Sequence, residues 1–203
     1  MKAREHRPLI VGLTGSIGMG KSTVAAMFAD EDIALFDADA AVHAMQAVGG
    51  ELVAEIEAAF PGTTGADGVD RKALGVAVLG DRDKLAKLEA IIHPAVARRR
   101  AQFLADHWDD DILLFDIPLL FEKGGEAAVD VTVVVSAPAS EQRARVLARP
   151  GMTTERFEHI LAIQMNDADK RARADHVIDT GASLSETRTQ VRNLVKSLRE
   201  GLA

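Results

Sequence analysis

The chain has 203 residues, of which 47% are hydrophobic and 27% are charged, and its formal net charge is -7 at pH 7. This length and composition predict one folded globular unit with an aliphatic core, and they exclude an intrinsically disordered chain. The acidic charge and the 4% aromatic content argue against a nucleic-acid partner, because such proteins need basic surfaces and stacking platforms. The absence of cysteine excludes disulfide bonds, thiolate metal sites and a thiol nucleophile.

Two short apolar runs near the N-terminus predict β-strands. Residues 9–13 form an unbroken apolar run, which is typical of a parallel strand buried on both faces. Residues 34–36 form a second strand, which leads directly into the Asp-Ala-Asp of residues 37–39. Between the two strands, the apolar residues of 21–30 recur at helical spacing. We therefore expect a strand, a helix and a strand, with the first strand at the centre of a sheet.

The middle of the chain predicts helices. Residues 52–60 carry apolar side chains on one helical stripe, and a Pro-Gly break then leads into a loop rich in Gly and Asp that runs to Asp70. Two further helices are predicted at residues 71–79 and 81–93. Pro94 is predicted to be the first residue of another helix, where its missing N–H costs nothing.

The last part of the chain alternates strands and helices. Strands are predicted at 112–116, 131–135 and 176–178, and helices at 139–149 and 153–165. A final helix begins with the capping box of Ser183 and Glu186. Short strands that alternate with helices predict an α/β fold, with a five-stranded parallel sheet covered by helices on both faces, because parallel neighbours need crossover connections.

A glycine-rich motif lies between the first strand and the first helix. Gly15, Gly20, Lys21 and Ser22 have the spacing of a phosphate-binding P-loop, and a strand-to-helix junction is the context that this motif requires. Its glycines let consecutive backbone N–H groups converge on a phosphate at the helix N-terminus. A plain strand-to-helix connection is the alternative interpretation. The spacing and the context together favour nucleotide binding and a three-layer fold of the P-loop NTPase type.

The P-loop assigns roles to particular residues. The residues predicted to bind ATP are Gly18, Met19, Gly20, Lys21, Ser22 and Thr23. Lys21 can reach the β- and γ-phosphate oxygens, and the Ser22 hydroxyl is placed to bind a Mg2+ ion that bridges these phosphates. Thr23 would lie beside the α-phosphate.

Other residues must distinguish between the classes of P-loop protein. The guanine-reading motif of GTPases and the signature motif of transporter ATPases are both missing from the sequence. Residues 143–173 hold seven basic and four acidic side chains in an otherwise acidic chain. This segment could close over ATP as a lid, with Arg145 and Arg149 on one helix face to grip phosphate oxygens. The alternative is a solvated helix face with ion pairs.

Several sequence blocks resemble the dephospho-coenzyme A kinase family, and the resemblance spans most of the chain. The matching blocks are residues 12–23, 37–39, Arg71 with Leu74, 88–89, 93–94, 118–122, Gln142 with Arg145 and Arg149, Gln164, and 174–179. The blocks at 37–39 and 118–122 distinguish this family from adenylate-like and shikimate-like kinases, which have similar cores.

The resemblance implies transfer of the ATP γ-phosphate to the 3′-hydroxyl of dephospho-CoA, which gives ADP and CoA in the last step of coenzyme A biosynthesis. It implies that Asp39 orients and deprotonates this hydroxyl and that His93 lines the CoA pocket. A carboxylate at the carboxyl end of a strand lies where α/β proteins place their ligands. The predicted catalytic residues are Lys21, Asp39, Arg145 and Arg149, and the cofactors are ATP and Mg2+.

Some of these assignments have structural alternatives. Asp37 or Asp39 could merely cap the following helix, which is a common role for aspartate. A histidine at a helix junction, such as His93, is often structural. Asp116 ends an apolar strand, where it could support Mg2+ or form a loop.

The sequence departs from the usual family pattern in several places near the expected site, among them His43 and Thr180. His43 stands where the family often has arginine, so a phosphate contact there would be weaker or dependent on pH. Thr180 replaces the usual asparagine, so an amide contact near the adenine cannot be transferred to this chain. Glu122 belongs to a family block but has no role that its spacing implies.

The resemblance implies one P-loop kinase domain, residues 1–203, with a helical CoA-binding insertion at about 40–107 and a lid at about 143–173. The polar residues 1–8 and the short apolar run after them predict no targeting or membrane segment, and so a cytoplasmic protein. We expect dephospho-CoA as the partner, no membrane contact, and a monomer or a weak homo-oligomer. The rival hypotheses are another small-metabolite kinase, of the nucleoside monophosphate type, and a non-catalytic ATP-binding regulator.

Overall fold

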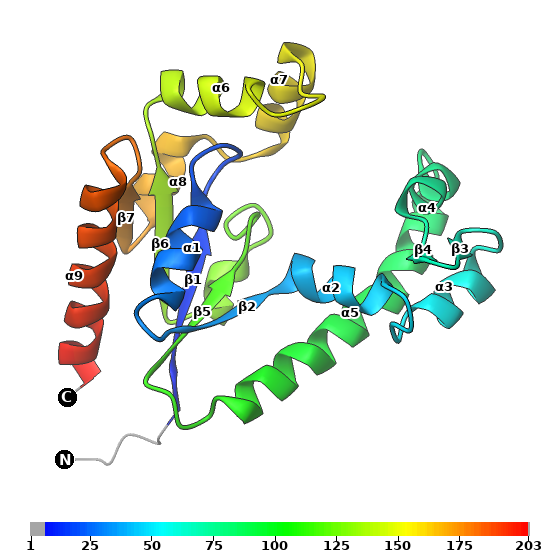
Figure 1. Ribbon diagram of the computed structural model, residues 1–203, viewed down its shortest axis with the longest axis horizontal. Coiled ribbons are helices and arrows are strands. Elements are labelled where there is room, and N and C mark those ends of the chain that lie inside the picture. The colour runs from blue at the N-terminus through cyan, green and yellow to red at the C-terminus, as the bar shows by residue number, and fades with distance from the viewer. Residues whose placement is uncertain (1–6, 203) are drawn as a thin grey trace. The chain divides into compact units, whose positions relative to one another are not determined.

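The structure is a computed structural model that describes residues 7–202 (Figure 1). Contacts divide the chain into two compact units: a first unit that combines the residues up to Phe36 with those from His107 onward, and a second unit, Asp37–Asp106. The expectation of no targeting segment falls largely on residues 1–6, outside the described residues. Among the described helices, none combines the length and the apolar character that crossing a membrane requires.

The first unit is built on the predicted parallel sheet. Its strands, in spatial order, are β2 (Ala34–Asp37), β5 (Ile112–Asp116), β1 (Leu9–Thr14), β6 (Val131–Ser136) and β7 (His176–Asp179). Strand β1 lies at the centre, as predicted, and pairs in parallel with both β5 and β6. The strands are continuous apolar runs because both faces of the sheet are covered, and β5 is buried along its whole length. The α/β fold class is confirmed.

Helices cover both faces of this sheet. Helices α1 (Lys21–Ala29) and α9 (Leu184–Leu202) pack against one face, in a buried cluster that includes Val133 of β6. The next residue, Val134, points to the opposite face and belongs to a second buried cluster. Helix α8 (Asp167–Arg173) contacts β6 on the side of that second cluster.

Local signals define the start of α9. The Ser183 hydroxyl accepts a hydrogen bond from the Glu186 N–H at 3.2 Å, and the Glu186 carboxylate accepts one from the Ser183 N–H at 3.0 Å. This reciprocal arrangement satisfies two backbone donors that the first turn of a helix leaves without partners. The predicted capping box is confirmed.

The segment between β6 and β7 differs from its prediction. Helix α6 (Ala139–Leu147) ends before Arg149, because the residue that precedes a proline is disfavoured in the helical region. The prediction that Arg145 and Arg149 share a helix face is therefore wrong. After α7 (Thr154–Ile163), the separate helix α8 was not predicted; the Asn166 side chain caps it by accepting a bond from the Asp169 N–H.

The second unit is helical apart from one small hairpin. It consists of α2 (Ala38–Gln46), α3 (Val53–Ala59), the strands β3 (Thr64–Gly65) and β4 (Gly68–Val69), α4 (Arg71–Val78) and α5 (Arg82–Asp106). Met45, Ile56, Leu74 and Leu88, one from each helix, belong to its own buried apolar cluster. The hairpin replaces part of the predicted irregular loop. It turns at residues 66–67, and β4 begins at Gly68, whose φ of 90° suits glycine.

Helix α5 runs through Pro94 without a break, so the predicted separation into two helices is wrong. A proline inside a helix removes one backbone hydrogen bond and normally kinks or ends the helix. Here Leu88 and Ala95, on either side of Pro94, are both buried in the same apolar cluster. Pro94 itself is exposed, so its helix face is open to water. Packing on the opposite face holds the two halves in one helix.

Candidate functional site

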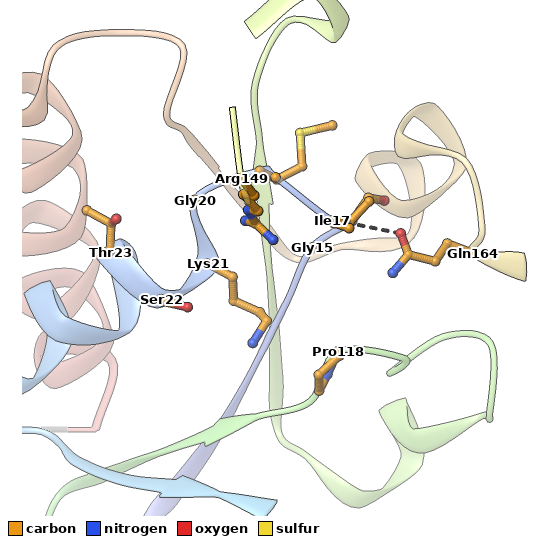
Figure 2. A pocket seen from close by; sticks show the side chains of 12 residues that line it. Gly15, Ile17, Gly20, Lys21, Ser22, Thr23, Pro118, Arg149 and Gln164 are labelled. Atoms are coloured by element: carbon orange, nitrogen blue, oxygen red, sulfur yellow. Dashed lines mark hydrogen bonds between the residues drawn. The ribbon is translucent and has the colours of Figure 1, made fainter. Parts of the chain in front are cut away.

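The P-loop forms one wall of a pocket of about 270 Å³ in the first unit (Figure 2). Residues 15–23, Pro118, Arg149 and Gln164 line this pocket. All six residues predicted to bind ATP are therefore among its lining. The loop leaves the carboxyl end of the central strand and enters the N-terminus of α1, where backbone N–H groups and the helix dipole favour an anion.

Two glycines of the loop have left-handed backbone conformations. Gly18 has a φ of 79° and Gly20 a φ of 88°, values that residues with a side chain rarely adopt. A Cβ atom on Gly18 would also lie 2.4 Å from a methyl group of Val146, and one on Gly20 would lie 3.2 Å from the Thr180 hydroxyl. The backbone conformation thus favours glycine at both positions, and at Gly18 the close approach of Val146 also excludes a side chain.

Two glutamines form hydrogen bonds with the backbone of Ile17. Gln142 lies on α6, and Gln164 directly follows α7. The Gln142 amide, on α6, donates to the Ile17 carbonyl at 2.8 Å. The Ile17 N–H donates to the Gln164 side-chain oxygen at 3.0 Å, a bond drawn in Figure 2. Sequence reasoning placed both glutamines in family blocks without a role. The structure shows that they fix the first half of the P-loop.

Met19 contributes to the site through its backbone. Its side chain is 2% exposed, and its sulfur accepts a hydrogen bond from the Ala137 N–H at 3.2 Å. The Met19 carbonyl accepts a hydrogen bond from the Thr180 hydroxyl at 2.7 Å. No local sequence signal indicated this second bond, because Thr180 lies 161 positions further along the chain.

The Lys21 ammonium group forms an ion pair with the carboxylate of Asp116. Both side chains are largely buried, at 18% and 7% exposure. Strand pairing explains their proximity, since Asp116 is the last residue of β5 and lies beside Leu13 of β1, just before the P-loop. Support of Mg2+ by Asp116 stays a prediction. The sequence did not predict that Lys21 and Asp116 form an ion pair.

The basic side chains of residues 143–173 have different environments. Arg149 lines the pocket, whereas Arg145 directs its two terminal nitrogens to the hydroxyl and the carbonyl of Thr180, at 3.2 and 2.7 Å. Four others form ion pairs with acids: Arg143 with Glu158, Lys170 with Glu122, Arg171 with Asp167, and Arg173 with Glu126. The alternative of an ion-paired, solvated helix face thus describes Arg143, Arg171 and Arg173, whereas Lys170 is buried. Lid closure and the catalytic roles of Arg145 and Arg149 stay predictions.

Glu122, which had no role from sequence, lies at the centre of a buried contact. One carboxylate oxygen accepts a hydrogen bond from the Met165 N–H at 2.8 Å and lies 2.8 Å from the Lys170 ammonium nitrogen. Burial alone would raise the pKa of Glu122, but these interactions outweigh it and keep the pKa below its ordinary value. The charged pair therefore holds the segment that carries Gln164.

The remaining predicted residues belong to the second unit. Asp37 caps α2, because its carboxylate accepts a hydrogen bond from the Ala40 N–H at 2.9 Å. Asp39 lies exposed in the first turn of the same helix, so the capping role falls to Asp37. His43 and His93 are exposed on α2 and α5. Their roles toward a substrate stay predictions.

Donors for a metal ion are sparse in the protein part of the site. Within residues 7–202, no group of three or more His, Cys, Asp or Glu side chains is arranged to hold a metal. An ion that is bound mainly by substrate phosphates and one or two protein oxygens needs no such group, and Mg2+ is bound in this way in many phosphotransferases.

Comparison with known proteins agrees with the motifs and the fold. The family model described as dephospho-CoA kinase matches residues 9–186. A dephospho-CoA kinase from Novosphingobium aromaticivorans is 60% identical over 194 residues, which cover 96% of each chain. The crystal structure of TT1252 from Thermus thermophilus has a TM-score of 0.80 and 35% identity, and the match covers 95% of this chain and 98% of that one.

A second solved structure supports the fold. The dephospho-CoA kinase from Campylobacter jejuni matches 93% of this chain and 96% of its own, with a TM-score of 0.65 and 21% identity. The resemblance inferred from the sequence blocks is confirmed. On the family match and the 60% identical relative, the chain belongs to the dephospho-CoA kinase family, whose members are ATP-dependent phosphotransferases.

Proposed function

We propose that the chain transfers the γ-phosphate of ATP to the 3′-hydroxyl of dephospho-CoA, giving ADP and CoA. The observation that carries this proposal is the phosphate pocket of residues 15–23, with its glycine conformations and its lysine, in a member of this family. A protein that only binds ATP would need the P-loop and no further catalytic groups. Phosphoryl transfer also needs groups that position the acceptor and stabilise the charge that develops on the phosphate.

The reaction forms a bond between the acceptor oxygen and the γ-phosphorus and breaks the bond from that phosphorus to the oxygen of the β-phosphate, so that ADP leaves. The proton of the 3′-hydroxyl passes to a carboxylate, for which we propose Asp39. Supporting this assignment, Asp37 already caps α2, and Asp39 is exposed one residue inside the helix. We propose that His93, exposed on α5, contributes to the CoA pocket.

The cations of the pocket would act on the phosphates. We propose that Lys21 exchanges Asp116 for the β- and γ-phosphate oxygens when ATP binds, and that Arg149, which also lines the pocket, contacts the same oxygens. Arginine suits such a position because its planar guanidinium can form two hydrogen bonds to a phosphate and stays charged.

The oxygen donors at the pocket fit Mg2+. The Ser22 hydroxyl lines the pocket, and the Asp116 carboxylate lies next to Lys21. Mg2+ prefers oxygen ligands and keeps several waters, so these two groups and the phosphates suffice. When bound, the ion would neutralise charge on the β- and γ-phosphates. The Ser22 hydroxyl and the Asp116 carboxylate would help to hold it.

An assay of ADP release tests the proposed function. Purified protein is supplied with ATP, Mg2+ and one acceptor at a time: dephospho-CoA, AMP, uridine or shikimate. We expect turnover with dephospho-CoA at least about 100-fold faster than with the other acceptors. Turnover of AMP or uridine instead would support a kinase for another small metabolite. ATP binding without turnover of any acceptor would support a non-catalytic regulator.

The Asp39→Asn variant tests the proposed base. We expect kcat to fall by about 100-fold or more while ATP affinity stays within about twofold, because the lost group acts on the acceptor. Asp83→Asn is a matched control, since Asp83 also lies in the first turn of a helix of the second unit. An unchanged kcat in Asp39→Asn would remove Asp39 from the mechanism.

A further inference from the structure

We propose that Thr180 is a positioning residue that links the P-loop to Arg145, so that a single hydroxyl group holds both. The inference rests on the proposed function, because it concerns groups that handle phosphate. Thr180 directly follows β7 and is 7% exposed. Its own N–H donates to the Ser136 carbonyl at 2.8 Å, so the threonine backbone is held by the end of the neighbouring strand.

The hydroxyl of Thr180 can make both side-chain contacts at once. A hydroxyl has one proton to donate and lone pairs that accept. The Met19 carbonyl lies 2.7 Å from the Thr180 oxygen and the Ser136 carbonyl 3.3 Å, so the proton belongs to the bond with Met19. Arg145 has only donors, and its Nη1 lies 3.2 Å from the same oxygen, which accepts. Valine, of nearly the same shape, could make neither bond.

The bond to Met19 fixes a peptide plane in the P-loop. In a trans peptide the carbonyl oxygen and the following N–H point in opposite directions. Because the Met19 carbonyl points to Thr180, the N–H of Gly20 points away from Thr180. Gly20 lines the pocket and is the N-cap of α1, so its N–H is one of the helix-terminal donors that can bind an anion. Thr180 thus orients one of these donors before the nucleotide arrives.

Arg145 depends on the same residue. It lies in the last turn of α6, and its second terminal nitrogen donates to the Thr180 carbonyl at 2.7 Å. Both ends of the guanidinium are therefore directed at one residue. Loss of the Thr180 hydroxyl removes one of these two bonds and, at the same time, releases the Met19 carbonyl. The loop and the arginine should lose their geometry together.

Two substitutions at Thr180 and one control test this link. Thr180→Val removes the hydroxyl and keeps the shape, and Thr180→Ser keeps the hydroxyl. Thr189→Val is the matched control, because Thr189 is exposed on α9 and its hydroxyl bonds to the Ser185 carbonyl within that helix. The measurements are ADP and ATP binding by calorimetry, kcat and both KM values with ATP and dephospho-CoA, and the thermal unfolding temperature without nucleotide.

In Thr180→Val we expect the Kd for ADP and the KM for ATP to rise about fivefold or more, the size expected for loss of a neutral hydrogen bond to Met19 together with one from the charged Arg145 guanidinium. The KM for dephospho-CoA should stay within about twofold, since the groups proposed to bind that substrate, Asp39 and His93, lie outside the P-loop. Thr180→Ser and Thr189→Val should resemble the unmodified protein. Wild-type-like ADP binding in Thr180→Val would overturn the proposal. An equal loss in Thr180→Ser would also overturn it, because the packing of the methyl group would then be the cause.

A double variant tests the connection to Arg145. Arg145→Met alone should lower kcat/KM for ATP, and Arg145→Met combined with Thr180→Val should be less impaired than the product of the two single effects. The link would be overturned if the loss of kcat/KM in the double variant equals the product of the two single losses to within about twofold. ADP binding needs no acceptor, so it still tests Thr180 if dephospho-CoA is not phosphorylated. Failure of the proposed function is therefore distinguishable from failure of this inference.

Discussion

The ammonium group of Lys170 is fully buried and lies 2.8 Å from the carboxylate of Glu122, which is itself only 14% exposed. Glu122 also accepts a hydrogen bond from the Met165 N–H. Gln164, which precedes Met165, accepts a hydrogen bond from the N–H of Ile17 in the P-loop. The buried pair thus supports the phosphate-binding loop through one short segment. The pair matters for the free energy of unfolding because removing one member would leave the other charge buried without a partner.

Removing one member of this pair should be strongly destabilising. We expect Lys170→Met or Glu122→Gln to lower the free energy of unfolding by about 3–5 kcal/mol, measured by urea denaturation. Replacing both by apolar residues, as in Lys170→Met with Glu122→Leu, should recover much of this loss. Lys196→Met breaks the exposed pair of Lys196 with Glu200 and should cost about 0–1 kcal/mol. A Lys170→Met variant as stable as this control would contradict the prediction.

Gln164 should matter for ATP more than for stability. Gln164→Leu leaves the Ile17 N–H without its acceptor and frees the first half of the loop. We expect the KM for ATP to rise about fivefold or more, since an unsatisfied donor costs roughly 1–3 kcal/mol, with a smaller effect on kcat. Gln102→Leu is the control, because Gln102 is exposed on α5 and bonds only locally, to Asp106. An unchanged KM in Gln164→Leu would show that the loop keeps its geometry without this bond.

Replacing Asp116 by asparagine should leave ATP binding without metal intact and should weaken the use of Mg2+. In Asp116→Asn, Lys21 loses the carboxylate with which it pairs, so ATP affinity measured in EDTA should be equal to that of the unmodified protein or tighter. The Mg2+ concentration that gives half the maximal rate should rise about tenfold, because a metal-supporting carboxylate is lost. Asp109→Asn changes an exposed carboxylate before β5 and serves as the control. An unchanged Mg2+ requirement would show that Asp116 does not support the metal.

Asp175 should give a pH-dependent contribution to stability. Its carboxylate accepts hydrogen bonds from the Thr132 N–H at 2.8 Å and the Thr132 hydroxyl at 2.7 Å, and these bonds lower the pKa of Asp175 below its ordinary value. A carboxyl group whose pKa is lower in the folded state stabilises the fold above its unfolded pKa of about 3.9. That contribution is lost as the pH falls through the folded-state pKa.

We therefore expect Asp175→Asn to be less stable than the unmodified protein by about 1–2 kcal/mol at pH 7, with the difference shrinking below about pH 4. Urea denaturation at several pH values between 3 and 7 measures this. Asp67→Asn, at an exposed position in the hairpin turn of the second unit, should show no such change. A difference that stays constant over the whole pH range would show that the carboxylate charge is not the cause.

Local patterns predicted those parts of the molecule in which neighbouring residues decide the structure. The apolar run of residues 9–13 predicted the central strand, and the Ser183 and Glu186 capping box predicted the start of α9. The P-loop was predicted because glycine conformations and a helix N-terminus are encoded within eight residues. The family blocks identified the kinase family for the same reason, since their order and spacing are visible in the chain itself.

Tertiary contacts decided the rest. Lys170 and Arg149 belong to the same basic segment, yet one is buried against Glu122 and the other lines the pocket. Pro94 continues a helix because apolar residues on both sides of it share one core. Thr180 bonds to Met19 from 161 positions away. Ion pairs, cores and buried hydrogen bonds join residues that are distant in sequence, so no local pattern specifies their partners. The chain by itself therefore determined the sheet, the loop and the family, and only the folded structure showed which side chains hold that loop in place.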